Sequence, residues 1–178
     1  MKKILALVLF FMAFSMYAQQ ESEERQHYSQ FDIATSLKGN SNYGEIDSNG
    51  VRSDYWFLPD GLSVKYGIGI HHEKWVALGI HTGIDWLGTD KLVIVPVFAN
   101  LRVCPKIGKE SRVYLQAGFG KSFGIGRGSL IGEFRKISLG IENDEGLSLF
   151  IQISSFGIPF KNLDSAASLS IGLSLFTF

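Results

Sequence analysis

Strict alternation of apolar and small polar residues in the closing stretch, residues 168–178, is the feature that most limits the possible folds. Serine or glycine alternates there with four aliphatic residues, Leu169, Ile171, Leu173 and Leu175. A period of two places these two sets of side chains on opposite faces of a β-strand. Because chain termini are usually solvated and frayed, an apolar strand that ends on Phe178 is unusual for a soluble protein.

The same alternation recurs along the chain, and no window shows the 3.6-residue period of an amphipathic helix. Strands of this kind, separated by turn residues, predict an all-β fold: an eight-stranded antiparallel up-and-down barrel. The expected strands cover residues 31–37, 61–71, 75–86, 92–103, 112–123, 132–142, 147–156 and 168–178. Since Pro96 cannot donate a hydrogen bond to a neighbouring strand, a bulge or irregularity is expected there.

The connections between these strands differ in length at the two ends of the predicted barrel. The turns expected at residues 72–74, 104–110 and 143–146 are short except for the seven-residue middle one, and the connections at the other end, 39–60, 87–91, 124–131 and 157–167, include the longest loop. Short turns on one side and longer loops on the other are typical of a transmembrane β-barrel with periplasmic turns and outer loops.

The N-terminus predicts export. Lys2 and Lys3 precede an apolar run over residues 4–14, and small residues then lead to Ala18. This pattern is typical of a signal peptide, residues 1–18, cleaved after Ala18. The run is shorter than the ~20 apolar residues of a membrane-spanning helix. The polar residues 19–30 are expected to form a flexible lead-in, and residues 31–178 the barrel domain.

Charge and cysteine content exclude some functions. The chain has 17 Lys and Arg against 17 Asp and Glu, and loss of the signal peptide removes two lysines. The exported chain therefore has no positive excess that would recruit nucleic acid. Cys104 is the single cysteine, so the fold forms without an internal disulfide.

The composition of the polar face predicts which side is inside. Glycine, serine and alanine dominate that face, and the interior of an eight-stranded barrel is just wide enough for side chains to fill. Aliphatic residues on the other face would then meet lipid. Aromatic residues near strand ends suit membrane interfaces: Tyr55, Trp56, Phe57, Trp75 and Trp86. The alternative is a secreted, lipocalin-like barrel whose aliphatic face lines a cavity for an apolar ligand.

Two segments, residues 95–102 (VPVFANLR) and 114–120 (YLQAGFG), look like the central hairpin of the small outer-membrane β-barrel proteins of Gram-negative bacteria. The terminal Phe176 and Phe178 resemble the membrane-assembly signal of that family. The resemblance implies an outer-membrane location, contact with outer-membrane lipid, recognition of the last strand by the barrel-assembly machinery, and a monomer. The family usually places its terminal aromatic on the lipid face, whereas Phe178 shares the phase of Ser174. Either a bulge resets the phase or the signal is degenerate.

Charged residues on the inward phase must be paired inside the barrel. Arg102 is expected to bridge Asp32 or Glu142 near the periplasmic end, and Lys65 is expected to pair with Asp85 nearer the outer end. The candidate lumenal network consists of Asp32, Lys65, Asp85, Arg102, Tyr114, Gln116, Lys136 and Glu142. Such a network would leave the lumen filled, unlike that of an open porin.

Catalytic and metal sites are weakly supported. His81 and Asp85 share a face, but four residues along a strand span ~13 Å, too far for a direct hydrogen bond. His71 and His72 lie on opposite faces, and the glycine-rich residues 124–129 lack the helix of a phosphate-binding loop. The leading hypothesis is a non-enzymatic barrel with a structural or surface-interaction role and no cofactor. A lipid-modifying enzyme of the outer membrane is the second alternative.

Overall fold

The computed structural model describes residues 26–40, 43–44, 52–89, 91–107, 111–125, 130–158 and 167–178. The expected signal peptide and most of the expected lead-in lie outside these residues. The strands are β1 (His27–Gly39), β2 (Phe57–His72), β3 (Val76–Leu87), β4 (Leu92–Val103), β5 (Ser111–Ile125), β6 (Leu130–Asn143), β7 (Leu147–Ser155) and β8 (Ala167–Thr177). No helix in the described part of the chain is long and apolar enough to cross a membrane.

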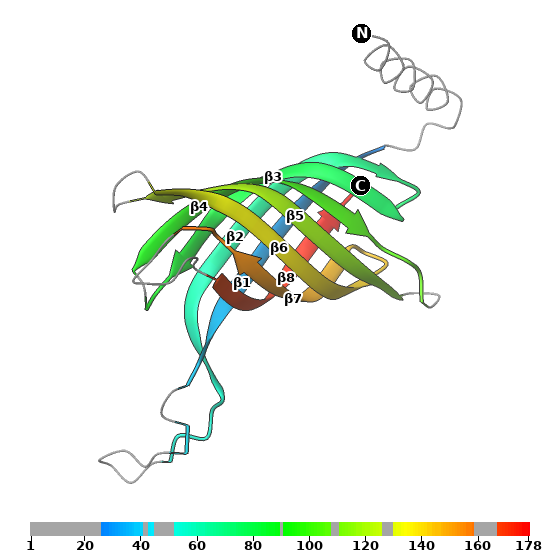
Figure 1. Cartoon of the computed structure of the whole chain (residues 1–178). Coiled ribbons are helices and arrows are strands. Elements are labelled where there is room, and N and C mark those ends of the chain that lie inside the picture. Colours follow the sequence, from blue (N-terminus) through cyan, green and yellow to red (C-terminus); the bar gives the residue numbers. More distant parts are fainter. Residues whose placement is uncertain are drawn as a thin grey trace, which may run out of the picture.

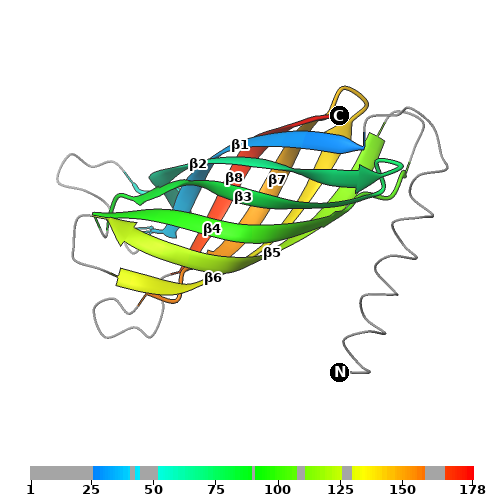
Figure 2. The same ribbon diagram turned by 90° about the horizontal axis from the view of Figure 1, so that it is seen from above.

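The eight strands form one closed barrel in which each strand pairs antiparallel with its neighbours in sequence (Figure 1). β1 closes the ring by pairing with β8. Figure 2 shows the tilted strands wrapped around a common axis. Closure removes the free sheet edges that would otherwise invite association. The predicted fold class, an eight-stranded antiparallel up-and-down barrel, is therefore confirmed.

The two ends of the barrel are unlike. We call the end where β1 begins and β8 ends the termini end, and the opposite end the loop end. The termini end carries the connections between β2 and β3, β4 and β5, and β6 and β7, and the loop end carries the other four. At the loop end the first hairpin projects beyond the other strands (Figure 1), with Asn40 bonded to Trp56 and Gly44 to Ser53.

Several strands are longer than the sequence pattern predicted. β1 begins at His27 rather than at residue 31, so the expected lead-in over residues 19–30 is wrong for its last four residues. Tyr28 and Gln30 continue the inward phase of the strand and are buried in the barrel. β2 begins at Phe57 rather than at residue 61 because it continues past a shift in register: Ser36 pairs with Gly61, but Leu37 pairs with Pro59.

The residue skipped by this shift, Asp60, fixes the neighbouring loop. Its carbonyl accepts a hydrogen bond from the Gly88 amide at 2.6 Å, and its carboxylate accepts one from the Thr89 amide at 3.0 Å.

The irregularity expected at Pro96 is present as a gap in the pairing of β3 with β4, where Pro96 and Val95 lie opposite Gly83 and Ile84. The register is the same on both sides of that gap, so it is not a bulge.

The faces of the sheet divide as the composition predicted. Aliphatic side chains of all eight strands point outward; Ile80, for example, is 67% exposed. Most of the serine, glutamine and charged side chains within the strands point inward and are buried, among them Gln30, Lys65 and Arg102. The alternative of a soluble barrel with an aliphatic cavity is therefore wrong, because it required the opposite orientation. An aliphatic surface of this extent is stable against lipid and costly against water.

Candidate lumenal site

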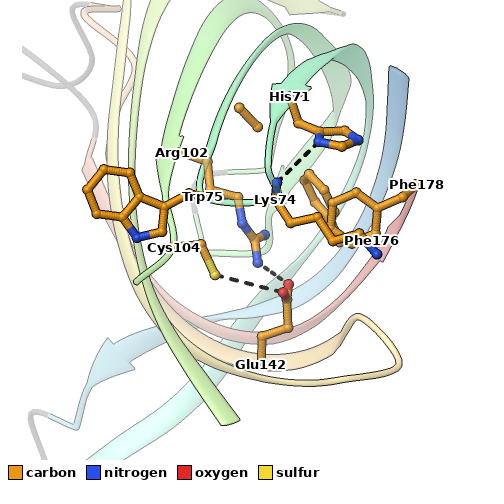
Figure 3. Close-up of a pocket in the computed structure, with 9 residues that line it drawn as sticks. His71, Lys74, Trp75, Arg102, Cys104, Glu142, Phe176 and Phe178 are labelled. Carbon is orange, nitrogen blue, oxygen red and sulfur yellow. Dashed lines mark hydrogen bonds and ion pairs between the residues drawn. The ribbon is translucent and has the colours of Figure 1, made fainter. Parts of the chain in front are cut away.

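An ion pair buried at the termini end of the lumen joins β4 to β6. Arg102 donates a hydrogen bond through Nη2 to Glu142, and both side chains are 2% exposed (Figure 3). The Arg102 guanidinium also lies 3.8 Å from the ring centroid of Tyr114 and 4.4 Å from that of Phe176. A buried cation is stabilised by such a carboxylate and by aromatic faces, each of which offers it negative potential.

The C-terminal aromatic residues complete this cluster from β8. Phe176 is buried and stacks on Tyr28, with ring centroids 4.5 Å apart. Phe178 is half-buried, with its ring 4.8 Å from that of His71 and 4.3 Å from the Lys74 Nζ. β8 pairs with β1 in one unbroken register through Phe176. The bulge considered from the sequence is therefore absent from this pairing, and Phe176 faces the lumen instead of lipid.

Cys104 lies just beyond β4 and is buried against the same ion pair. Its Sγ donates to the Glu142 Oε1 at 3.8 Å. Burial raises the pKa of the thiol, so less of the reactive thiolate forms near neutral pH. Cys104 also lines a crevice with Arg102, Glu142 and Phe178 (Figure 3). This crevice has no room for a water molecule. The side chains at this part of the termini end are therefore closely packed.

A second polar group lies in the middle of the lumen. The Lys136 Nζ is 3.8 Å from the Asp32 carboxylate, which accepts a hydrogen bond from Gln30 at 2.7 Å. Gln116 donates to Gln30 at 2.9 Å and accepts from Ser138 at 3.3 Å. Asp32 was expected to share a cluster with Arg102 and Glu142, but its salt bridge is with Lys136. The strands of a barrel are tilted and staggered against one another. Two residues at the same distance from the ends of their own strands can therefore lie at different heights along the barrel axis.

A third group combines Lys65 with Asp85. The Lys65 Nζ lies 2.6 Å from the Asp85 Oδ1 and also donates to the Ser63 hydroxyl. His81 lies apart from this pair: its Nε2 is 3.2 Å from the Tyr28 hydroxyl and 3.4 Å from the Asn100 Nδ2. His81 and Asp85 therefore have different partners, as their spacing along one strand predicted.

Glycines opposite the large inward rings provide the space for them. A Cβ on Gly67 would lie 2.3 Å from ring atoms of His81, and one on Gly140 would lie 2.5 Å from the Tyr114 ring. Such contacts are too short for any other residue without a shift of the ring or the strand. The glycine-rich inward face thus matches the aromatic and polar residues that fill the lumen.

The loop end of the lumen is filled by an apolar plug, which the sequence reasoning missed. After β7 the chain turns inward, and the Ser122 hydroxyl donates to the Phe156 carbonyl. Seven buried side chains make up the plug: Leu87, Leu92, Ile94, Phe98, Phe134, Phe156 and Ile158. A signal for it was present, because Leu92, Ile94 and Phe98 share the inward phase of Arg102.

The eight candidate network residues are all buried in the lumen, from Tyr114 at 1% exposed to Asp85 at 4%. They form three separate groups rather than one network: Arg102 with Glu142 and Tyr114, Lys136 with Asp32 and Gln116, and Lys65 with Asp85. Among the described residues, no group of three or more His, Cys, Asp and Glu side chains could hold a metal ion. These groups fill the lumen and neutralise its charges.

Comparison with known proteins identifies the fold but not the family. No protein-family model and no curated protein matches the sequence. Among solved structures, Neisserial surface protein A (NspA) has a TM-score of 0.54 and 15% identity, over 86% of this chain and 98% of NspA. The outer membrane enzyme PagL has a TM-score of 0.52 and 11% identity, over 83% of this chain and 98% of PagL.

The architecture is therefore that of the small outer-membrane β-barrels. One of these neighbours is described as a surface protein and the other as an enzyme. Because one fold hosts different functions, the role of this chain must come from its own residues.

Proposed function

We propose that the protein is a non-enzymatic β-barrel of the outer membrane with a structural or surface-interaction role. The observation that carries this proposal is the combination of an aliphatic outer surface with a side-chain-filled lumen. Outward residues in the middles of the strands, such as Ile80 and Leu139, are 67% and 57% exposed. A closed barrel satisfies its backbone hydrogen bonds internally, as a bilayer requires.

The connections suggest how the barrel is oriented in the membrane. We assign the end that carries the described termini to the periplasm, because the two longest connections, β1–β2 and β7–β8, lie at the opposite end. The projecting first hairpin then faces the outside. That hairpin carries Tyr43, Tyr55 and Trp56, with Tyr55 73% exposed and the rings of Tyr43 and Trp56 4.8 Å apart. Exposed aromatic side chains are frequent in binding surfaces, which supports a role in surface interaction.

Membrane fractionation tests the location. The expressed protein should sediment with the outer membrane and should migrate on gels as a compact form that heating converts to a slower one. Recovery as a soluble periplasmic protein would contradict the proposal.

The lipid-modifying enzyme remains the alternative to be tested. His81 contacts Tyr28 and Asn100, whereas Asp85 pairs with Lys65, so the geometry does not bring His81 and Asp85 together as a histidine–carboxylate pair. Envelope lipids should therefore be the same in cells that express the wild type, His81→Gln or no protein. A lipid change that requires His81 in a folded barrel would favour the enzyme.

A further inference from the structure

Three charged side chains interrupt the aliphatic outer surface. These residues are Lys121 on β5 and Glu133 and Arg135 on β6. They are the exposed charged residues of the described strands when the first two and last two residues of each strand are left out. They lie together, because Lys121 pairs across the strands with Glu133, and Phe119 pairs with Arg135. All three are in the half of the barrel nearer the loop end.

The cluster carries an excess positive charge. The Arg135 Nη2 lies 2.7 Å from the Glu133 carboxylate, and these side chains are 68% and 50% exposed. Lys121 forms no ion pair or hydrogen bond with any residue that the structure describes. One arginine with unused N–H donors and one unpaired lysine therefore face outward beside a single carboxylate.

The surroundings of the cluster are apolar. Phe119, Phe123 and Ile131 face outward beside it and are 59%, 39% and 60% exposed. The Arg135 guanidinium lies 5.9 Å from the Phe119 ring centroid. On the side of β4, Lys121 is opposite Val97. A group that binds here must therefore present a negative charge next to hydrocarbon.

We propose that Lys121 and Arg135, with Glu133 orienting the arginine, bind the phosphate group of a lipid in the outer leaflet. This inference rests on the proposed membrane location and orientation. From Lys121 to Ile125, the last residue of β5, is ~13 Å along a tilted strand, which places the cations within reach of the headgroup region by extension of their side chains. Arginine offers a planar fork and lysine a point charge, a suitable pair for phosphate oxygens. The phenylalanines beside them would contact the acyl chains of the same lipid.

Native mass spectrometry of the full-length protein in phosphatidylcholine nanodiscs tests this inference. The discs contain either bisphosphorylated lipid A or the same lipid without phosphates. The wild type should retain the phosphorylated lipid about tenfold more than the other, since charge-assisted bonds to phosphate are lost with the phosphates. The Lys121→Leu/Arg135→Leu variant should retain both lipids equally. The leucines match the rest of the outer surface, so the variant should fold.

Controls separate the possible reasons for failure. Arg52→Ala/Lys91→Ala removes the same charge from exposed sites on the first hairpin and the β3–β4 loop and should leave retention unchanged. Lys121→Leu/Glu133→Gln/Arg135→Leu removes the carboxylate as well and should behave like the double variant.

Millimolar inorganic phosphate should not compete with the phosphorylated lipid for this site. Competition would assign the site to a free ion and overturn the proposal of a lipid ligand. Equal retention by the wild type and the double variant, with the wild type in the outer membrane, would overturn this inference alone. Absence of the wild-type protein from the outer membrane in the fractionation experiment would overturn the proposed function instead.

Discussion

At the termini end of the lumen a buried ion pair and the rings of Tyr28, Tyr114 and Phe176 fill the barrel, whereas seven apolar side chains fill it at the loop end. The same strands run through both halves, but the residues that they point into the lumen differ. The stability of the termini end therefore depends on keeping a charge paired. The stability of the loop end depends on the close packing of these apolar side chains.

The largest effect is expected from removal of the buried cation. Arg102→Ala should lower the free energy of unfolding by about 3–5 kcal/mol, because Glu142 would stay buried without a partner. Urea unfolding in detergent micelles, followed by tryptophan fluorescence, measures this loss. The Arg102→Met/Glu142→Leu variant should regain most of it. A double variant as unstable as Arg102→Ala would show that the ion pair is not what stabilises this end.

Truncation in the plug should act through packing alone. Ile158→Ala should cost about 2–5 kcal/mol, the usual range for loss of a buried aliphatic side chain, because Ile158 is fully buried among Phe134, Phe156 and their neighbours. The cost should be the same at low and high salt in the same unfolding assay. A marked dependence on salt would mean that charges contribute to this end as well, and the contrast between the two ends would fail.

The outer surface offers a third comparison. Ile80→Arg should cost about 2–4 kcal/mol, as for a cation near the middle of a bilayer, when unfolding is measured in lipid vesicles. Tyr55→Arg, at a 73% exposed position on the first hairpin, is the matched control and should cost little. Equal tolerance of arginine at the two positions would show that the face bearing Ile80 does not meet lipid.

The smallest effect is expected from an exposed ion pair. Arg52 lies 3.2 Å from Asp54, but these side chains are 64% and 71% exposed. Arg52→Ala should therefore cost at most ~1 kcal/mol, as is usual for surface pairs. A loss as large as that of Arg102→Ala would remove the distinction between buried and exposed charges.

The fold could be predicted because the barrel repeats one physical rule on every strand. Alternation fixes which residues face inward, so the burial of Lys65, Arg102 and Glu142 followed from their phase alone. Their partners did not follow, because pairing across the lumen depends on strand tilt and register. Asp32 shows this: its phase was right, but its height matches Lys136 rather than Arg102.

The plug and the terminal phenylalanine were harder to predict for a different reason. The expectation of a polar lumen led to the inward apolar residues Ile94 and Phe98 being passed over. The inward phase of Phe176 was noticed, but a bulge could have reversed it, and only the pairing of β8 with β1 shows that none does. The assembly role of Phe176 and Phe178 remains a prediction.

Conductance across planar bilayers tests the central claim, a filled lumen, most directly. With its ion pairs and its plug in place, the purified protein should give no steady ion current above that of protein-free bilayers. Large, steady, ion-permeable openings would contradict the account, because they would require a water-filled path through both the Arg102–Glu142 cluster and the apolar plug.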